Sequence, residues 1–134
     1  MLFRSGITPA KLGVVYPPPS LERVTRLLGP RAKRLLYTGD LIDAHEALRI
    51  GLVDEVLPEA ELDHRAAQLC ATLAQRSLLT QAATKAMVGE VLAHGSVSAD
   101  VAEEWARTAA HAPDLAEGVA AFTEKRPPRF TWTG

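Results

Sequence analysis

The chain has 134 residues, about the size of one domain with a buried core. Apolar residues make up 47% of it and aromatic residues only 5%, so leucine, valine and alanine must fill the interior, which favours packed helices. A formal net charge of −1 excludes the basic excess that marks general binders of nucleic acid or membrane surfaces. No signal-peptide pattern opens the chain and no apolar run reaches membrane-spanning length, so we expect a soluble cytoplasmic protein.

Residues 1–16 form the first predicted element, an extended, strand-like segment that ends at Tyr16. Three prolines follow, each of which fixes its own φ, and Pro17 also pushes Tyr16 toward extended backbone. Tyr16 is therefore expected at a rigid strand end. The other strand-like run is the brief residues 52–57, and no further partner strand is visible. The first segment is therefore expected either to dock on helices in an irregular way or to pair with a sheet that this chain lacks. The local pattern also fits a plain loop between a strand and a helix.

Capping residues and glycines divide the rest of the chain into helices. Ser20 is the expected N-cap of the first helix, and Gly29 is its expected stop. Asp43 and Glu46 have the spacing of a capping box, and Gly51 closes that helix. The later segments carry apolar residues at helical spacing. The predicted helices cover residues 20–29, 30–39, 43–51, 58–77, 78–95, 98–111 and 114–126.

Residue types that carry catalysis or bind metals are sparse. The single cysteine, Cys70, lies among helix-forming residues and is expected to be a small buried apolar residue. The histidines fall on separate segments without metal-ligand spacing, so solvated or capping roles are expected and no metal site is predicted. The chain contains neither a glycine-rich phosphate loop nor a nucleophile elbow. The histidines are His45, His64, His94 and His111.

Two blocks of the sequence resemble the crotonase (enoyl-CoA hydratase/isomerase) superfamily. They are "LGVVYPPPSLERVTRLLGPRAKRLLYTGDLIDAHEALRIGLVDEVLP" and "DLAEGVAAFTEKRPPRF", with an "AATK" helix between them. The resemblance implies the α/β ClpP/crotonase-like spiral fold, of which this chain would be a predominantly α-helical part with one or two short strands. It also implies that residues 1–40 end the crotonase core and that residues 41–134 form a helical C-terminal trimerisation region.

The resemblance covers only the C-terminal half of such a protein. In the family, the preceding half supplies most of the spiral β-sheet and the two backbone N–H groups of the oxyanion hole. Oxyanion stabilisation is usually the largest catalytic contribution, about 3–4 kcal/mol for a single donor. We therefore expect the isolated chain to be close to inactive.

The segment "TPAKLGVVY" departs from the hydratase pattern of the family. Hydratases place a glutamate where this chain has Pro9, and proline can neither deliver nor remove a proton. The segment is more similar to the methylmalonyl-CoA decarboxylase branch, and this resemblance assigns catalytic roles to the hydroxyls of Thr8 and Tyr16. Loss of CO₂ leaves a thioester enolate, so neutral hydroxyls that orient the substrate carboxylate replace a strong base.

A second site is implied near the end of the chain. The resemblance gives Phe122 and Lys125 contacts with the coenzyme A of a neighbouring subunit, with the ring against adenine and the cation against phosphate. From the residues alone, Phe122 equally fits the core of the last helix, and Lys125 fits a cation favoured by the helix dipole. Both interpretations stay open at this point.

The resemblance therefore implies an acyl-CoA-metabolising enzyme with a decarboxylase-like active-site variant. The alternatives are an enoyl-CoA hydratase-type lyase and a non-catalytic remnant that acts as an oligomerisation module. The expected partners are an acyl-CoA thioester and further copies of the chain in a trimer or hexamer, with no nucleic acid and no membrane. Coenzyme A enters only as part of the substrate, and no separate cofactor is expected.

Overall fold

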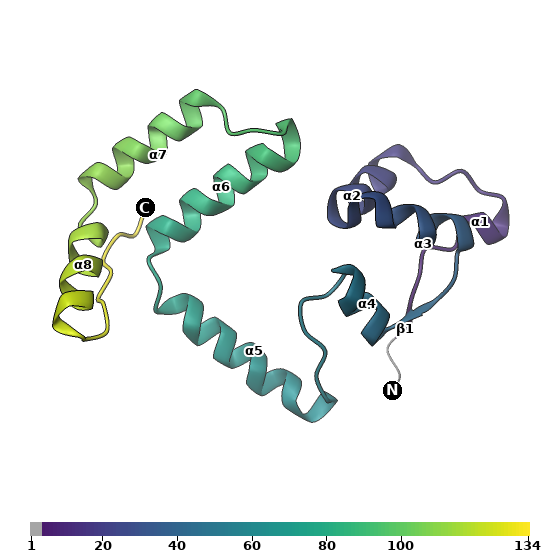
Figure 1. Cartoon of the computed structure of the whole chain (residues 1–134), viewed down its shortest axis with the longest axis horizontal. Coiled ribbons are helices and arrows are strands. Elements are labelled where there is room, and N and C mark those ends of the chain that lie inside the picture. The colour runs from purple at the N-terminus through teal and green to yellow at the C-terminus, as the bar shows by residue number, and fades with distance from the viewer. Residues whose placement is uncertain (1–3) are drawn as a thin grey trace. The chain divides into compact units, whose positions relative to one another are not determined.

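A computed structural model describes residues 4–134 of the chain, which divides into two compact units, residues 1–59 and residues 60–134 (Figure 1). The first unit contains a two-stranded antiparallel sheet, four α-helices and one 3₁₀-helix. Its elements are β1 (Arg4–Ser5), α1 (Pro9–Leu12), α2 (Pro18–Leu28), η1 (Gly29–Arg31), α3 (Ala32–Thr38), β2 (Ile42–Asp43) and α4 (Ala44–Ile50).

The partner of the first strand is β2, with Arg4 opposite Asp43 and Ser5 opposite Ile42. This pairing needs a glycine beside it, because a Cβ at Gly6 would lie 2.8 Å from the Asp40 carbonyl oxygen. Residues 52–57, the other strand-like run of the sequence, form no strand. Leu52 instead donates its N–H to the Ala47 carbonyl at 2.9 Å, which folds the chain back on the end of α4.

The single long strand predicted for residues 1–16 is wrong from residue 6 onward, and its first three residues lie outside the described part of the chain. Pro9 stands at the first position of the short helix α1, where its fixed φ is compatible with a helical turn, and Gly13 ends that turn at φ 65°. The preference of proline for the first helical turn also makes α2 start earlier in the chain than predicted. That helix begins at Pro18 with Pro17 as its N-cap, rather than with the predicted cap Ser20, because prolines suit a first helical turn that needs no N–H donors.

An apolar core holds the first unit together, and α2, α3, α4 and β2 contribute to it. Val24, Leu36, Leu52 and Val53 pack against it as half-buried neighbours. Local capping orders the elements around it: the Asp43 carboxylate accepts the Glu46 N–H at 2.8 Å, as the predicted capping box requires, and Gly51 ends α4. The buried residues of this core are Leu28, Ala32, Leu35, Ile42, Ala47 and Ile50.

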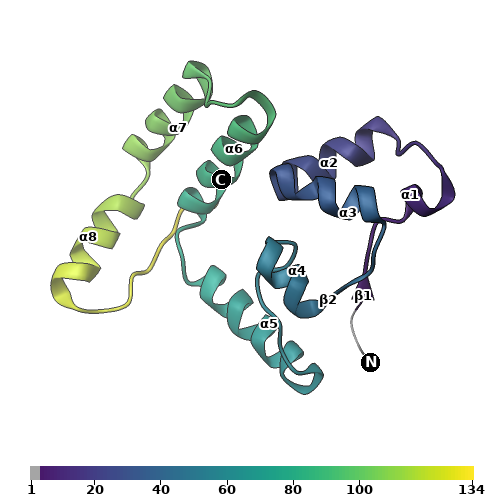
Figure 2. The same ribbon diagram turned by 45° about the vertical axis from the view of Figure 1, so that its right-hand side comes forward.

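The second unit is helical throughout its described elements (Figure 2). Helices α6 and α7 lie side by side, and the C-terminal tail, residues 125–134, returns along α8 (Figures 1 and 2). Ser77 caps α6 by accepting the Thr80 N–H, and Gly95 ends it as predicted. The helices are α5 (Glu59–Ala74), α6 (Leu78–His94), α7 (Ala99–His111) and α8 (Asp114–Glu124).

Helix α5 exposes the apolar stripe that its sequence pattern predicts to be buried. No residue of α5 is buried, and Leu62, Leu69 and Leu73 are each about half exposed. Cys70 is exposed as well, so the prediction of a buried cysteine is wrong. The periodicity identifies the helix correctly, but burial of its stripe needs a covering element that the described part of residues 60–134 does not supply.

No helix among the described residues 4–134 is long and apolar enough to cross a membrane. Within the same residues, no group of three or more His, Cys, Asp or Glu side chains is placed to hold a metal ion. The four histidines are all exposed.

Candidate functional site

Thr8 and Tyr16 flank α1 rather than marking the two ends of one extended segment. Thr8 is the N-cap residue of α1, is exposed, and makes no side-chain capping hydrogen bond. Tyr16 is half-buried and precedes Pro17, whose φ of −61° and ψ of 139° keep the chain extended at that point. Among the described residues no hydrogen bond joins the two side chains, so their cooperation in catalysis stays a prediction.

The position of Thr8 depends on Gly39, a residue that sequence reasoning treated only as a helix stop. Gly39 is buried at φ 62°, and a Cβ there would lie 3.1 Å from Lys11 Cγ and 3.4 Å from Thr8 Cα. Lys11 also pairs with Asp40 across 3.3 Å. The turn at residues 38–40 therefore packs directly against α1. A glycine between two polar residues in the sequence could have predicted this turn.

Phe122 lies in the last turn of α8, and Lys125 is the residue directly after that helix. Phe122 is 86% exposed, so the alternative that placed it in the core of the last helix is wrong. Lys125 is exposed and adopts φ 54° and ψ 40°, the one non-glycine residue with positive φ among the described residues. The end of α8 thus carries an exposed ring and, three residues further on, an exposed cation.

Glu117 ties the C-terminal tail to α8. Its carboxylate receives two hydrogen bonds from the Arg126 guanidinium, at 2.6 and 2.9 Å, and one from the Arg129 backbone N–H at 2.6 Å. These hydrogen bonds, led by that of Arg126, lower the pKa of Glu117 to about 2. The paired carboxylates in turn raise the pKa of Arg126 above its usual range, so the pair is ionised at all ordinary pH values.

A second carboxylate fixes the last part of the tail. Asp114 is buried and accepts the Ser77 hydroxyl at 2.6 Å, while its other oxygen faces the Thr131 and Trp132 N–H groups at 3.4 and 3.3 Å. The Trp132 ring then lies 6.4 Å from that of Trp105 on α7. Asp114 and Glu117, one turn apart, hold two successive parts of the tail.

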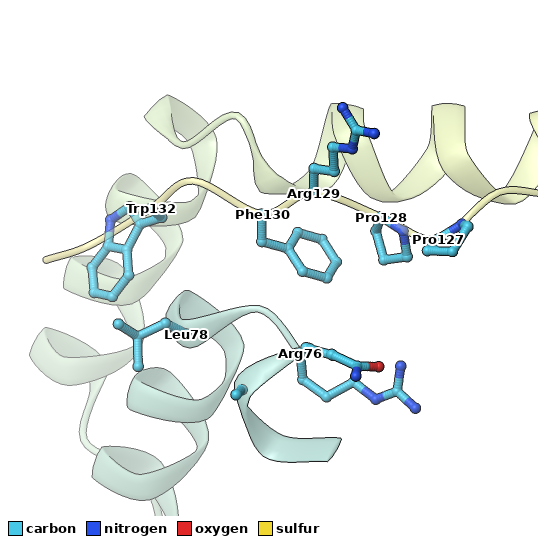
Figure 3. Close-up of a pocket in the computed structure, with 9 residues that line it drawn as sticks. Arg76, Leu78, Pro127, Pro128, Arg129, Phe130 and Trp132 are labelled. Atoms are coloured by element: carbon cyan, nitrogen blue, oxygen red, sulfur yellow. The ribbon is translucent and has the colours of Figure 1, made fainter. Parts of the chain in front are cut away.

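Two cavities lie beside this tail, and sequence reasoning identified neither. The larger, about 690 Å³, separates the tail from the junction of α5 and α6 (Figure 3). Phe130 and the two prolines point from the tail into it, whereas the Arg129 side chain points away. The second, about 490 Å³, is mostly apolar and includes Phe122 in its wall. The first is lined by Ala74, Gln75, Arg76, Leu78, Pro127, Pro128, Arg129, Phe130 and Trp132.

Residues 4–133 match the model of the enoyl-CoA hydratase/isomerase family, and the chain belongs to that family. The described fold, helical with two short strands, agrees with a portion of the crotonase fold. A crystal structure of an enoyl-CoA hydratase/carnithine racemase from Magnetospirillum magneticum matches 96% of this chain and 48% of its own, with a TM-score of 0.83 and 32% identity.

Among curated proteins, a putative enoyl-CoA hydratase of Thermus thermophilus is 37% identical over 131 residues, covering 95% of this chain and 51% of the relative. A methylmalonyl-CoA decarboxylase of Escherichia coli is 30% identical over 128 residues, covering 92% of this chain and 49% of that protein. The chain thus spans about half the length of the relatives it matches.

Proposed function

We propose that this chain is the C-terminal part of a cytoplasmic acyl-CoA lyase in which the hydroxyls of Thr8 and Tyr16 replace the carboxylate of hydratases. The observation that carries the proposal is Pro9, the first residue of α1, which cannot exchange a proton and stands where the family's hydratases have glutamate. The similarity to a methylmalonyl-CoA decarboxylase supports it.

Decarboxylation fits neutral groups at this site. The carbon–carbon bond to the carboxylate breaks, CO₂ leaves, and the electron pair passes into the thioester carbonyl as an enolate that is then protonated at carbon. A glutamate about 4 Å from the substrate carboxylate would repel it by about 4 kcal/mol at an effective dielectric of 20. Hydroxyls avoid that penalty and can hold the carboxylate by hydrogen bonds. The Thr8 hydroxyl supports this role because it is exposed and not used as a helix cap.

The second part of the proposal concerns coenzyme A. Phe122 offers an exposed ring on which an adenine can stack, and Lys125, three residues further on, offers a cation for a phosphate. Aromatic and cationic side chains in this spacing suit a ligand that joins a base to a phosphate ester.

A chimera tests the reaction, because the family's oxyanion donors lie in the half that the matched region does not cover. The half of the Thermus thermophilus relative that precedes the matched region is joined to this chain, and both methylmalonyl-CoA and crotonyl-CoA are offered. We expect decarboxylation without hydration, lost in Thr8→Val and Tyr16→Phe. Hydration of crotonyl-CoA by the chimera would favour the hydratase alternative instead.

The isolated chain supplies the matching control. We expect it to turn over neither substrate above background, because one missing oxyanion donor alone costs about 10²–10³-fold in rate. Turnover by the isolated chain that disappears in Thr8→Val or Tyr16→Phe would contradict the dependence on the preceding half.

A specific observation favours the alternative of a non-catalytic oligomerisation module. Leu115, Val119 and Phe122 form one stripe of α8 and are 75%, 59% and 86% exposed. Apolar stripes of this kind mark association surfaces. We expect sedimentation velocity over a hundredfold concentration range to show a trimer. Leu115→Asp should dissociate this trimer, whereas Leu12→Asp, an equally exposed change on α1, should leave it intact. A compact monomer at every concentration would contradict this module.

A further inference from the structure

The end of α8 has a conformation that its sequence does not favour. The helix closes with the Lys125 N–H on the Phe122 carbonyl at 3.3 Å and the Arg126 N–H on the Ala121 carbonyl at 3.0 Å. This closure needs a left-handed residue after the last helical turn, which is usually glycine. Here the residue is Lys125, whose Cβ makes the left-handed region unfavourable. Another interaction must therefore hold the turn.

Arg126 supplies that interaction. Its guanidinium spans two carboxylates, with both Nη atoms on Glu117 and Nε on Glu124 at 2.6 Å. Glu117 lies two and a half turns back along α8, so the bond across it fixes the direction of the chain directly after Lys125. The Arg129 N–H on the same carboxylate holds the chain three residues further on. Lys125 is thus locked between the helix and a fixed tail.

The ion pairs of Arg126 also determine whether an acidic side chain is available to neutralise Lys125. Glu117, in the first turn of α8, and Glu124, its last residue, are both paired with Arg126. In the described part of the chain, Lys125 itself forms no ion pair. The ammonium group is left as an uncompensated cation three residues after the exposed Phe122.

We propose that Arg126, through Glu117 and Glu124, is a positioning residue that presents Phe122 and Lys125 as a ring-and-cation pair for the nucleotide end of coenzyme A. This inference rests on the coenzyme A part of the proposed function and adds the residues that make the pair. Arg126 does not touch the ligand. It sets the backbone turn of Lys125 and keeps both glutamates from neutralising the lysine.

Arg129 provides a matched control, because Arg129→Ala removes the same charge three residues away. It leaves the Arg129 N–H on Glu117, and the side chain it removes makes no ion pair in the described residues. Arg126→Lys is the second variant: it keeps the positive charge but loses the two-pronged bond to Glu117. Circular dichroism establishes that each variant is folded.

The experiment measures the binding of coenzyme A to the 134-residue chain by calorimetry. We expect Arg126→Ala and Arg126→Lys to raise the dissociation constant about tenfold, and Arg129→Ala to raise it no more than about twofold. NMR couplings that report φ at residue 125 should leave the positive range in both Arg126 variants and keep it in Arg129→Ala. This last readout depends on the turn and not on any ligand.

The outcomes distinguish the positioning role of Arg126 from the assignment of coenzyme A as the ligand. If Arg126→Ala and Arg129→Ala weaken binding equally, net charge suffices and the positioning role is overturned. If residue 125 keeps its positive φ in both Arg126 variants, the positioning role is likewise overturned. If the wild-type chain binds no coenzyme A, the ligand assigned to Phe122 and Lys125 fails, and the positioning proposal that rests on it fails too.

Discussion

The two units of the chain are held together by different forces. All of the core side chains in the described residues 4–59 are apolar, from Leu28 to Ile50. In residues 60–134 the buried side chains are Leu79 and Ala121 together with the polar pair Ser77 and Asp114. Apolar burial is non-directional, whereas hydrogen bonds to a carboxylate fix direction. The first unit is thus stabilised mainly by its core, and the second holds its tail in one defined path.

The largest expected change in stability comes from the apolar core of the first unit. Two neighbouring leucines of α2, one buried and one exposed, allow the contribution of burial to be measured. Leu28 is 5% exposed and Leu27 is 57% exposed. Leu28→Ala should lower the free energy of unfolding by about 2–5 kcal/mol, because it removes buried methyl groups and leaves a cavity. Leu27→Ala should change it by no more than about 0.5 kcal/mol. Urea unfolding measures both, and equal losses would show that the first unit has no such core.

The next effect tests the polar organisation of the second unit at Asp114. Asp114→Ala leaves the Ser77 hydroxyl and the Thr131 and Trp132 N–H groups without their acceptor, so we expect a loss of about 1–3 kcal/mol. Asp63→Ala, an exposed change on α5, is the control and should be nearly neutral. A double-mutant cycle with Ser77→Ala should show coupling between the two side chains. Additive effects would mean that the 2.6 Å hydrogen bond contributes little.

The contrast between the units also explains which features the sequence predicts. The cap of α4 was predictable because Asp43 and Glu46 are three residues apart and their bond is local. The pairing of β1 with β2 was not, because it depends on Gly6 passing close to Asp40, far along the chain. Each predicted helix is present, but some ends differ. Helix α2 starts earlier because proline chemistry outweighs the serine cap, the helix predicted from Pro30 opens as η1, and α5 ends at Ala74.

The candidate site also contains features that the sequence could predict and contacts that it could not. Phe122 and Lys125 came from the resemblance to the family, and the structure adds that both are exposed and that Lys125 has a left-handed backbone. The contact between Glu117 and Arg126 joins residues nine positions apart across a helix end, and no periodicity reports it. The exposed Cys70 illustrates a different limit of sequence-based prediction. A helical stripe of apolar residues predicts that one face is buried, but it does not identify the element that covers that face.

A smaller effect follows from the pH dependence of the Glu117 contact. The pKa of Glu117 falls from 4.5 to about 2 in the folded chain, chiefly through its hydrogen bonds with Arg126 and Arg129. A lowered pKa contributes stability that is fully present above the unfolded value and is lost as the pH falls from about 5 to about 2. Wild type should therefore exceed Glu117→Gln in stability at pH 7, and the difference should shrink across that range. A constant difference would show that the charge of Glu117 is not involved.

The smallest expected effect comes from Glu46, which is the counterpart of Glu117 in the first unit. Glu46 also bridges arginines, with Arg49 at 2.6 and 2.7 Å and Arg34 at 2.9 Å, and the hydrogen bond from Arg49 chiefly lowers its pKa. Its carboxylate, however, holds only exposed side chains, whereas that of Glu117 also accepts a backbone N–H from the tail. The contribution of Glu46 should likewise be lost as the pH falls below its unfolded pKa. Glu46→Gln should therefore give a pH-dependent change in stability of the same sign but smaller than that of Glu117→Gln, because exposed ion pairs contribute little when they order no backbone. Acid titration of both variants by circular dichroism measures the two changes, and an equal or larger change for Glu46 would show that the backbone contact of Glu117 adds nothing to its arginine pair.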